Sequence, residues 1–92
     1  MITSFKHKGL RDFFETGLDR RLSVPNSGRI RRILLALDAA SRPDDLNLPG
    51  FRFHALAGRL SGRYAVNASG NWRITFGWDG PNAVDVDLED YH

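Results

Sequence analysis

The sequence predicts a single α+β domain in which two helices pack on one face of a curved, mainly antiparallel sheet of four to five strands. Three observations lead to this prediction. The chain has 92 residues, a length that suits one domain. Its first half repeats apolar residues at helical spacing, and from residue 51 onward apolar and polar residues alternate with the period of a strand. The domain is therefore expected to cover residues 1–92 without a linker or a repeat.

Two apolar stripes in the first half have the period of a helix. The first consists of Leu10, Phe13, Phe14 and Leu18. Gly17 is expected to end this helix, because glycine readily adopts the left-handed conformation of a helix end. A second helix is expected over about residues 26–41, with Asn26 or Ser27 as its cap and Pro43 beyond its end. Its apolar stripe consists of Ile30, Ile33, Leu34 and Leu37.

Four stretches in the second half alternate apolar and polar residues and are expected to be half-buried strands. The positions expected to face the core are Phe51, Phe53 and Ala55, then Tyr64, Val66 and Ala68, then Trp72, Ile74, Phe76 and Trp78, and finally Val84, Val86 and Leu88. The short glycine-bearing connections between them suit antiparallel hairpins. Residues 1–5 are a weaker candidate for a first strand, and residues 43–50 leave room for one short turn.

Composition excludes several classes of protein. There is no cysteine, so disulfides and thiolate metal sites are ruled out. No apolar run approaches the ~20 residues of a membrane span, and residues 1–8 lack the apolar stretch of a signal peptide. The expected location is the cytoplasm, without a membrane partner. Neither metal-ligand spacing nor a glycine-rich phosphate loop is present, so no metal or cofactor is expected.

Charge is unevenly distributed along the chain. Residues 1–73 hold all 13 lysines and arginines with six acids, a net charge of +7, whereas residues 74–92 hold five acids and no base. Eleven of the 13 basic residues are arginine, whose planar guanidinium suits phosphate and stacks on bases. The pattern favours a nucleic-acid partner, and an ordinary solvated surface with an arginine bias is the alternative.

Sequence motifs along nearly the whole chain point to one family. They are Met1–Leu10, Phe13–Gly17, Leu37–Ala40, His54–Gly58, Asn71–Phe76 and Glu89–His92. In combination and in this order, they resemble the HigB-type toxins, or plasmid maintenance system killer proteins, of the RelE/ParE toxin superfamily. The resemblance implies a RelE-like fold, in agreement with the helix and strand pattern.

The resemblance also implies a function. HigB-type toxins belong to type II toxin–antitoxin systems and act as ribosome-dependent mRNA endonucleases that cleave mRNA in the A site and inhibit translation. The implied partners are the ribosome, mRNA and a HigA-type helix-turn-helix antitoxin, with operator DNA bound only through that antitoxin. RNA cleavage without a metal requires a base for the ribose 2′-OH, positive charge at the phosphate and an acid for the leaving oxygen.

His54 and Arg73 are the two candidates within predicted strands. His54 alternates with apolar residues and Arg73 lies between Trp72 and Ile74, so both are expected on the polar sheet face. The resemblance implies that His54 is catalytic, and Arg73 is expected to contact the phosphate in the transition state. The alternatives are a surface histidine and a salt bridge from Arg73 to Asp85 or Asp87.

The C-terminal tripeptide supplies the other catalytic candidates. Asp90, Tyr91 and His92 directly follow a predicted strand, which would hold them against the polar face. The resemblance implies proton transfer by His92 and contact of Tyr91 with an mRNA base. Asp90 would orient a histidine or share the proton transfer. The alternative is a frayed terminus without a role.

Arg52, Arg59 and Arg63 are expected to bind RNA, because they flank His54 and the turn that follows it. One position departs from the family. Relatives often read His-Pro-Leu-Lys-Gly where this chain has Ala57 in place of the lysine. This departure leaves open a catalytically weak toxin that serves mainly as its antitoxin's binding and co-repressor partner. A second alternative, from the same superfamily, is a ParE-like toxin that poisons gyrase.

Overall fold

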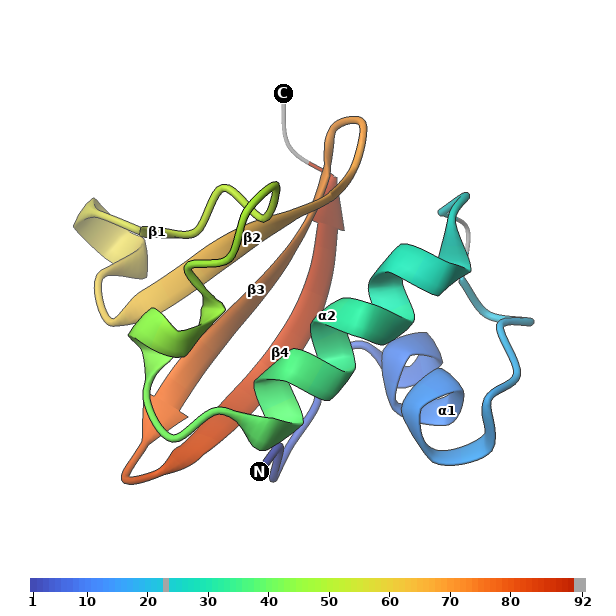
Figure 1. The fold of residues 1–92 in the computed structure, drawn as a ribbon, viewed down its shortest axis with the longest axis horizontal. Helices are drawn as coiled ribbons and strands as arrows, with labels where there is room; N and C mark the ends of the chain where they lie inside the picture. Colours follow the sequence, from blue (N-terminus) through green and yellow to red (C-terminus); the bar gives the residue numbers. More distant parts are fainter. Residues whose placement is uncertain (23, 91–92) are drawn as a thin grey trace.

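The computed structural model describes residues 1–22 and 24–90 as two helices on a four-stranded sheet (Figure 1). In chain order the elements are α1 (Lys8–Thr16), α2 (Ser27–Ala39), the 3-10 turn η1 (Pro43–Leu46), β1 (His54–Ala55), the 3-10 turn η2 (Gly58–Leu60), β2 (Arg63–Ser69), β3 (Trp72–Asp79) and β4 (Asn82–Asp90). All neighbouring strands are antiparallel, in the order β1-β2-β3-β4. The predicted α+β class, with two helices packed on an antiparallel sheet, is confirmed. In this described part of the chain, no helix combines the length and apolar character needed to cross a bilayer.

The N-terminal segment lies beside β4 at the edge of the sheet. Ile2 and Phe5 form isolated parallel bridges with Ala83 and Val86. The backbone N–H of Ile2 also donates to the Asp38 carboxylate at 3.0 Å, which ties this segment to the end of α2. The candidate first strand is thus present as two bridges, and it extends the sheet by one parallel neighbour without forming a full strand.

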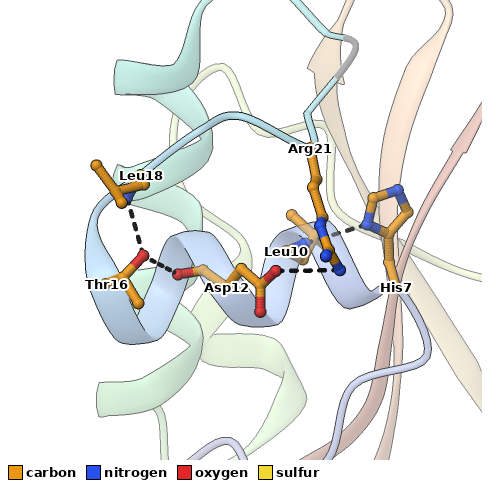
Figure 2. Close-up of polar contacts among 6 residues, drawn as sticks. All are labelled: His7, Leu10, Asp12, Thr16, Leu18 and Arg21. Carbon is orange, nitrogen blue, oxygen red and sulfur yellow. Dashed lines mark hydrogen bonds and ion pairs between the residues drawn. The ribbon is translucent and has the colours of Figure 1, made fainter.

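Helix α1 begins and ends at specific capping contacts. The Leu10 N–H donates to Nδ1 of His7 at 3.1 Å, so His7 is the N-cap. Gly17, at a φ of 78°, donates its N–H to the Phe13 carbonyl at 2.8 Å and ends the helix as predicted. Leu18 follows this end, and its N–H donates to the Thr16 hydroxyl (Figure 2). Its assignment to the buried stripe was wrong, because it lies beyond the helix and is 50% exposed.

Replacing Gly9 with Ala should destabilise the fold by about 1–3 kcal/mol, although this change in a helix ordinarily stabilises by about 0.5–1 kcal/mol. An added Cβ would lie 2.5 Å from the Arg21 carbonyl oxygen and 2.8 Å from Cε1 of the capping His7. Urea unfolding measures the change. Gly28→Ala is the matched control, because a Cβ at Gly28 meets nothing within 4 Å. Equal stability of the two variants would contradict the expected clash.

Helix α2 supplies much of the core. Its N-cap is Asn26, one of the two predicted residues, whose side-chain oxygen accepts the Arg29 N–H at 3.2 Å. The predicted stripe is confirmed, since all four of its members are at most 1% exposed: Ile30, Ile33, Leu34 and Leu37. They pack with Leu10 and Phe13 of α1 against Val66, Ile74, Phe76 and Leu88 of the sheet. This apolar layer fixes which sheet face remains open.

The β1 strand is shorter than the alternation predicted. Only His54 and Ala55 pair with β2, whereas a strand was expected from residue 51. Arg52 interrupts it, because its φ of 52° is left-handed and incompatible with a continuous strand. Phe51 is nevertheless buried, and Phe53 stacks on Tyr64 with 5.7 Å between ring centroids. The apolar contacts of Phe51 and Phe53 were therefore predicted correctly, whereas the core position predicted for Ala55 was wrong, because this residue is exposed.

A β-bulge in β4 changes which side chains face the core. The register with β3 shifts between the pairs Gly77–Val84 and Thr75–Asp87, and Asp85 has a φ of 50°. Ala83 and Val86 are consequently the buried neighbours, both 0% exposed. The prediction that Val84 faces the core was wrong, because the extra residue turns it to the opposite face, where its Cγ2 lies against Gly77.

Candidate active site

The sheet face turned away from the helices, here called the open face, carries the strand candidates. Its residues follow from the strand registers and are His54, Arg63, Ala65, Asn67, Arg73, Thr75, Gly77, Val84, Asp87 and Glu89. Small residues form its centre, and Ala65, Thr75 and Gly77 are buried there. The longer polar side chains therefore surround a central area of small side chains. The predicted polar face is present.

His54 lies at the edge of the open face, in register with Ala65 and, through it, with Thr75. Its side chain is exposed, and Nδ1 is 2.9 Å from the Arg52 carbonyl oxygen. A carbonyl can only accept, so this contact places the proton of a neutral imidazole on Nδ1. Nε2 then keeps its lone pair and can act as a base or bind a proton donor.

Arg73 lies two strands from His54 on the same face. Strand spacing and rise place the Cα atoms of the two residues about 12 Å apart. The Arg73 side chain is 17% exposed, and its Nε is 3.5 Å from a carboxylate oxygen of Glu89. The sequence had offered Asp85 or Asp87 as alternative partners, but the register of β3 and β4 pairs Arg73 with Glu89. Glu89 could not be identified as the partner from the sequence, because the bulge shifts which residue of β4 lies opposite Arg73.

The Arg63 side chain reaches from β2 across the open face to β3 and β4. Its Nη2 donates to the Thr75 hydroxyl at 3.1 Å and to the Asp85 carbonyl at 2.9 Å. The second contact satisfies a backbone oxygen at the bulge, so Arg63 links β2 to the point where β4 changes register. Both hydrogen bonds use Nη2, so this nitrogen of Arg63 is engaged by the fold. The RNA-binding role predicted for Arg63 would depend on the rest of the guanidinium.

Of the remaining predicted residues, Arg52 and Arg59 lie beside β1, whereas Asp90 lies on β4 at the other end of the strand order. Arg52 precedes β1 and is exposed. It was expected to be part of the same strand as His54, but its backbone is left-handed and its carbonyl contacts the His54 imidazole. Arg59 is exposed on η2, directly after Ala57 and Gly58. Asp90 ends β4, exposed and in register with Trp72, which puts it on the helix side of the sheet and not on the polar face where it was expected. Tyr91 and His92 lie outside the described residues.

The open face mixes both signs of charge. Arg63, Arg73 and His54 are accompanied by Asp87 and Glu89, so basic groups stand beside carboxylates. Across residues 1–22 and 24–90, no three histidine or carboxylate side chains gather as the ligands of a metal ion would. The chemistry that this face offers is proton transfer at imidazole and charge neutralisation by guanidinium.

Comparison with known proteins gives consistent matches. A family model described as the RelE-like toxin of the type II toxin–antitoxin system HigB matches residues 3–92. The chain is 38% identical to the endoribonuclease HigB of Proteus vulgaris over 92 residues, covering all of both chains. It is 37% identical to toxin HigB-1 of Vibrio cholerae over 81 residues, which cover 85% of this chain and 84% of that protein.

Proposed function

This chain belongs to the HigB family of RelE-like toxins of type II toxin–antitoxin systems, and from that membership we propose that it is a ribosome-dependent mRNA endonuclease acting in the A site. Its partners would be mRNA on the ribosome and a HigA-type antitoxin. The Proteus relative is named an endoribonuclease, which supports the reaction class. The observation that carries the proposal is the presence of His54, with its Nδ1 against a carbonyl, on the same sheet face as Arg73.

In the proposed reaction, the phosphorus is transferred from the 5′-oxygen of one nucleotide to the 2′-oxygen of the preceding ribose. One histidine takes the 2′-OH proton while the 2′-oxygen attacks phosphorus, and the P–O5′ bond breaks as an acid protonates the leaving oxygen. The products are a 2′,3′-cyclic phosphate and a 5′-OH. His54 and His92 would share the two proton transfers, with Asp90 assisting and Tyr91 stacked on a base. No step requires a metal ion.

Arg73 would neutralise the charge that develops on the phosphate. Guanidinium remains protonated and grips phosphate oxygens bidentately. Its ion pair with Glu89, in a side chain only 17% exposed, holds the guanidinium toward the open face before RNA binds. Preorganised charge of this kind stabilises a transition state more than charge that must be brought in. Arg52, Arg59 and Arg63 would contact neighbouring phosphates.

Dependence on the ribosome agrees with the charge of the open face. Asp87 and Glu89 stand beside the basic groups, and this reduces the attraction for free RNA. A chain of 92 residues also offers little surface with which to bury an RNA strand. The ribosome would supply the remaining contacts by holding the codon in place and by stacking of its RNA bases. Free mRNA is therefore expected to be cut poorly.

Three assays with the purified protein test the proposal: mRNA on ribosomes with an open A site, the same mRNA alone, and supercoiling by gyrase. Cleavage is expected only on the ribosome and without change when a chelator is present. His92→Ala should lower the rate by about 10²–10⁴-fold, because a proton-transfer group is lost. Circular dichroism checks that this variant is folded. Absence of cleavage on ribosomes by the folded wild-type protein would contradict the proposal.

A catalytically weak toxin is the second candidate. Two features favour it: Ala57 stands where the family resemblance implies a lysine, and one nitrogen of Arg63 is engaged by the fold. Fewer groups would then be available for phosphate. Tight antitoxin binding together with undetectable cleavage in the ribosome assay would support this candidate. Inhibition of gyrase would instead support a ParE-like toxin.

A further inference from the structure

We propose that Arg29, on the first turn of α2, is a positioning residue for His54. It would hold residues 50–52 in the conformation that directs the Arg52 carbonyl at Nδ1 of His54, and so fix Nε2 as the base of the reaction. The inference rests on the proposed function for its catalytic consequence. Its structural part, the protonated nitrogen of His54, can be tested without any cleavage assay.

Arg29 joins three parts of the fold. Its Nη2 donates to the Gly50 carbonyl at 2.6 Å and to the Asn67 carbonyl of β2 at 3.0 Å. The guanidinium carbon also lies 5.5 Å from the centroid of the Phe51 ring, a cation–π distance. Arg29 is the third residue of α2, and Asn26 fixes its backbone by the capping contact. One side chain therefore connects α2, the segment before β1, and β2.

The segment before β1 needs such a connection. β1 contains two residues, so strand pairing alone determines the place of His54 weakly. Gly50 and Arg52 both have left-handed backbones, with φ values of 84° and 52°. A left-handed conformation at a residue with a side chain persists where surrounding contacts hold it. The Asn67 N–H donates to the Phe51 carbonyl at 2.7 Å, next to the two carbonyls that Arg29 binds.

The left-handed Arg52 has a chemical consequence. Its carbonyl turns back toward the side chain two residues later and lies 2.9 Å from Nδ1 of His54. Proton acceptance at Nε2 produces an imidazolium whose Nδ1–H still donates to this carbonyl, so the contact also stabilises the product of the transfer. His54 is thereby assigned the base role. His92 would then be the acid that gives its proton to the leaving 5′-oxygen.

The decisive measurement is the tautomer of His54. Two-bond ¹H–¹⁵N correlation spectra of histidine-labelled protein at about pH 8.5, above the usual range of imidazole charging, distinguish Nδ1–H from Nε2–H. The His54 signals are assigned by comparison with His54→Gln. Wild-type protein is expected to show Nδ1–H. An Nε2–H tautomer in the wild-type protein would overturn the proposal, whatever the behaviour of any variant.

Variants of Arg29 test the positioning step. Arg29→Met keeps an unbranched side chain of similar helix propensity but loses both hydrogen bonds. It is expected to mix the two tautomers and to lower kcat on ribosome-bound mRNA by roughly 10- to 100-fold, with little change in KM. Arg32→Met is the matched control, because Arg32 is exposed on the same helix. Arg29→Lys should restore most of the Nδ1–H signal, since an ammonium also donates to two carbonyls.

The outcomes separate the inference from the proposed function. Arg29→Met protein that keeps a pure Nδ1–H tautomer would overturn the positioning role, whether or not its cleavage rate falls. The same result follows if Arg32→Met lowers kcat as much as Arg29→Met does. Failure of the wild-type protein to cut RNA would remove the proposed function, and the tautomer spectra would still decide whether Arg29 orders the segment at His54.

Discussion

His54→Ala should reduce the rate of cleavage of ribosome-bound mRNA by about 10²–10⁴-fold, the contribution typical of a general acid or base. The imidazole is exposed on the open face, and its Nδ1 is held at 2.9 Å from a backbone carbonyl. Alanine removes the only histidine that the described residues place on this face. Single-turnover cleavage with saturating protein measures the effect on the chemical step, because substrate binding and product release do not then limit the rate.

A second histidine provides the control for that experiment. His7 caps α1 through Nδ1 and is not part of the open face. His7→Asn preserves a side-chain acceptor that is well suited to an N-cap, so this variant should cleave at close to the wild-type rate. If His54→Ala also kept the wild-type rate, another group would have to be the base, and the proposed reaction would need a different arrangement of residues.

The helices were predictable because each depends on local signals. The apolar residues from Ile30 to Leu37 follow a single helical period. The capping residues Asn26 and Gly17 each lie within one turn of the helix end that they define. Leu18 shows the limit of such a pattern. It continues the spacing of the stripe, but the glycine before it reverses the backbone and leaves Leu18 exposed. A stop signal therefore outweighs a continued apolar spacing.

The strands were predictable in number and order but not in detail. Alternation cannot reveal the bulge at Asp85, because an extra residue changes the register without leaving a signature in the apolar pattern. The bulge is held from two sides, by the Ser4 hydroxyl at the Asp85 N–H and by Arg63 at the Asp85 carbonyl. Both contacts join residues far apart in sequence, so only the assembled fold specifies them.

For two of the candidate site residues the side of the sheet could be predicted, but their contacts could not. His54 and Arg73 lie on the expected face because alternation holds at both positions. Their partners were not predictable. Glu89 depends on the register beyond the bulge, and the Arg52 carbonyl depends on a left-handed residue in a segment that reads as a strand. At these two positions the sequence pattern predicts the side of the sheet, whereas the groups that contact each side chain depend on long-range contacts.

Phe76→Ala should destabilise the protein by about 3–5 kcal/mol, the usual cost of emptying a fully buried aromatic site. Phe76 is 0% exposed at the centre of β3. Its ring lies 5.8 Å from the centroid of Tyr64 and 6.2 Å from that of Trp78. Tyr64 in turn stacks on Phe53, which immediately precedes β1. The cavity would therefore weaken the aromatic row that leads to the His54 edge.

Urea unfolding measures this loss, and Leu35→Ala provides the comparison. Leu35 lies on α2 and is 50% exposed, so its truncation should change the free energy of unfolding by no more than about 0.5 kcal/mol. A small domain has a total stability of about 5–15 kcal/mol, so Phe76→Ala removes a large fraction of it. Similar losses in the two variants would show that the row from Phe53 to Trp78 is not the centre of the core. A loss confined to Phe76→Ala would establish that packing of the row from Phe53 to Trp78 contributes strongly to the stability of the domain.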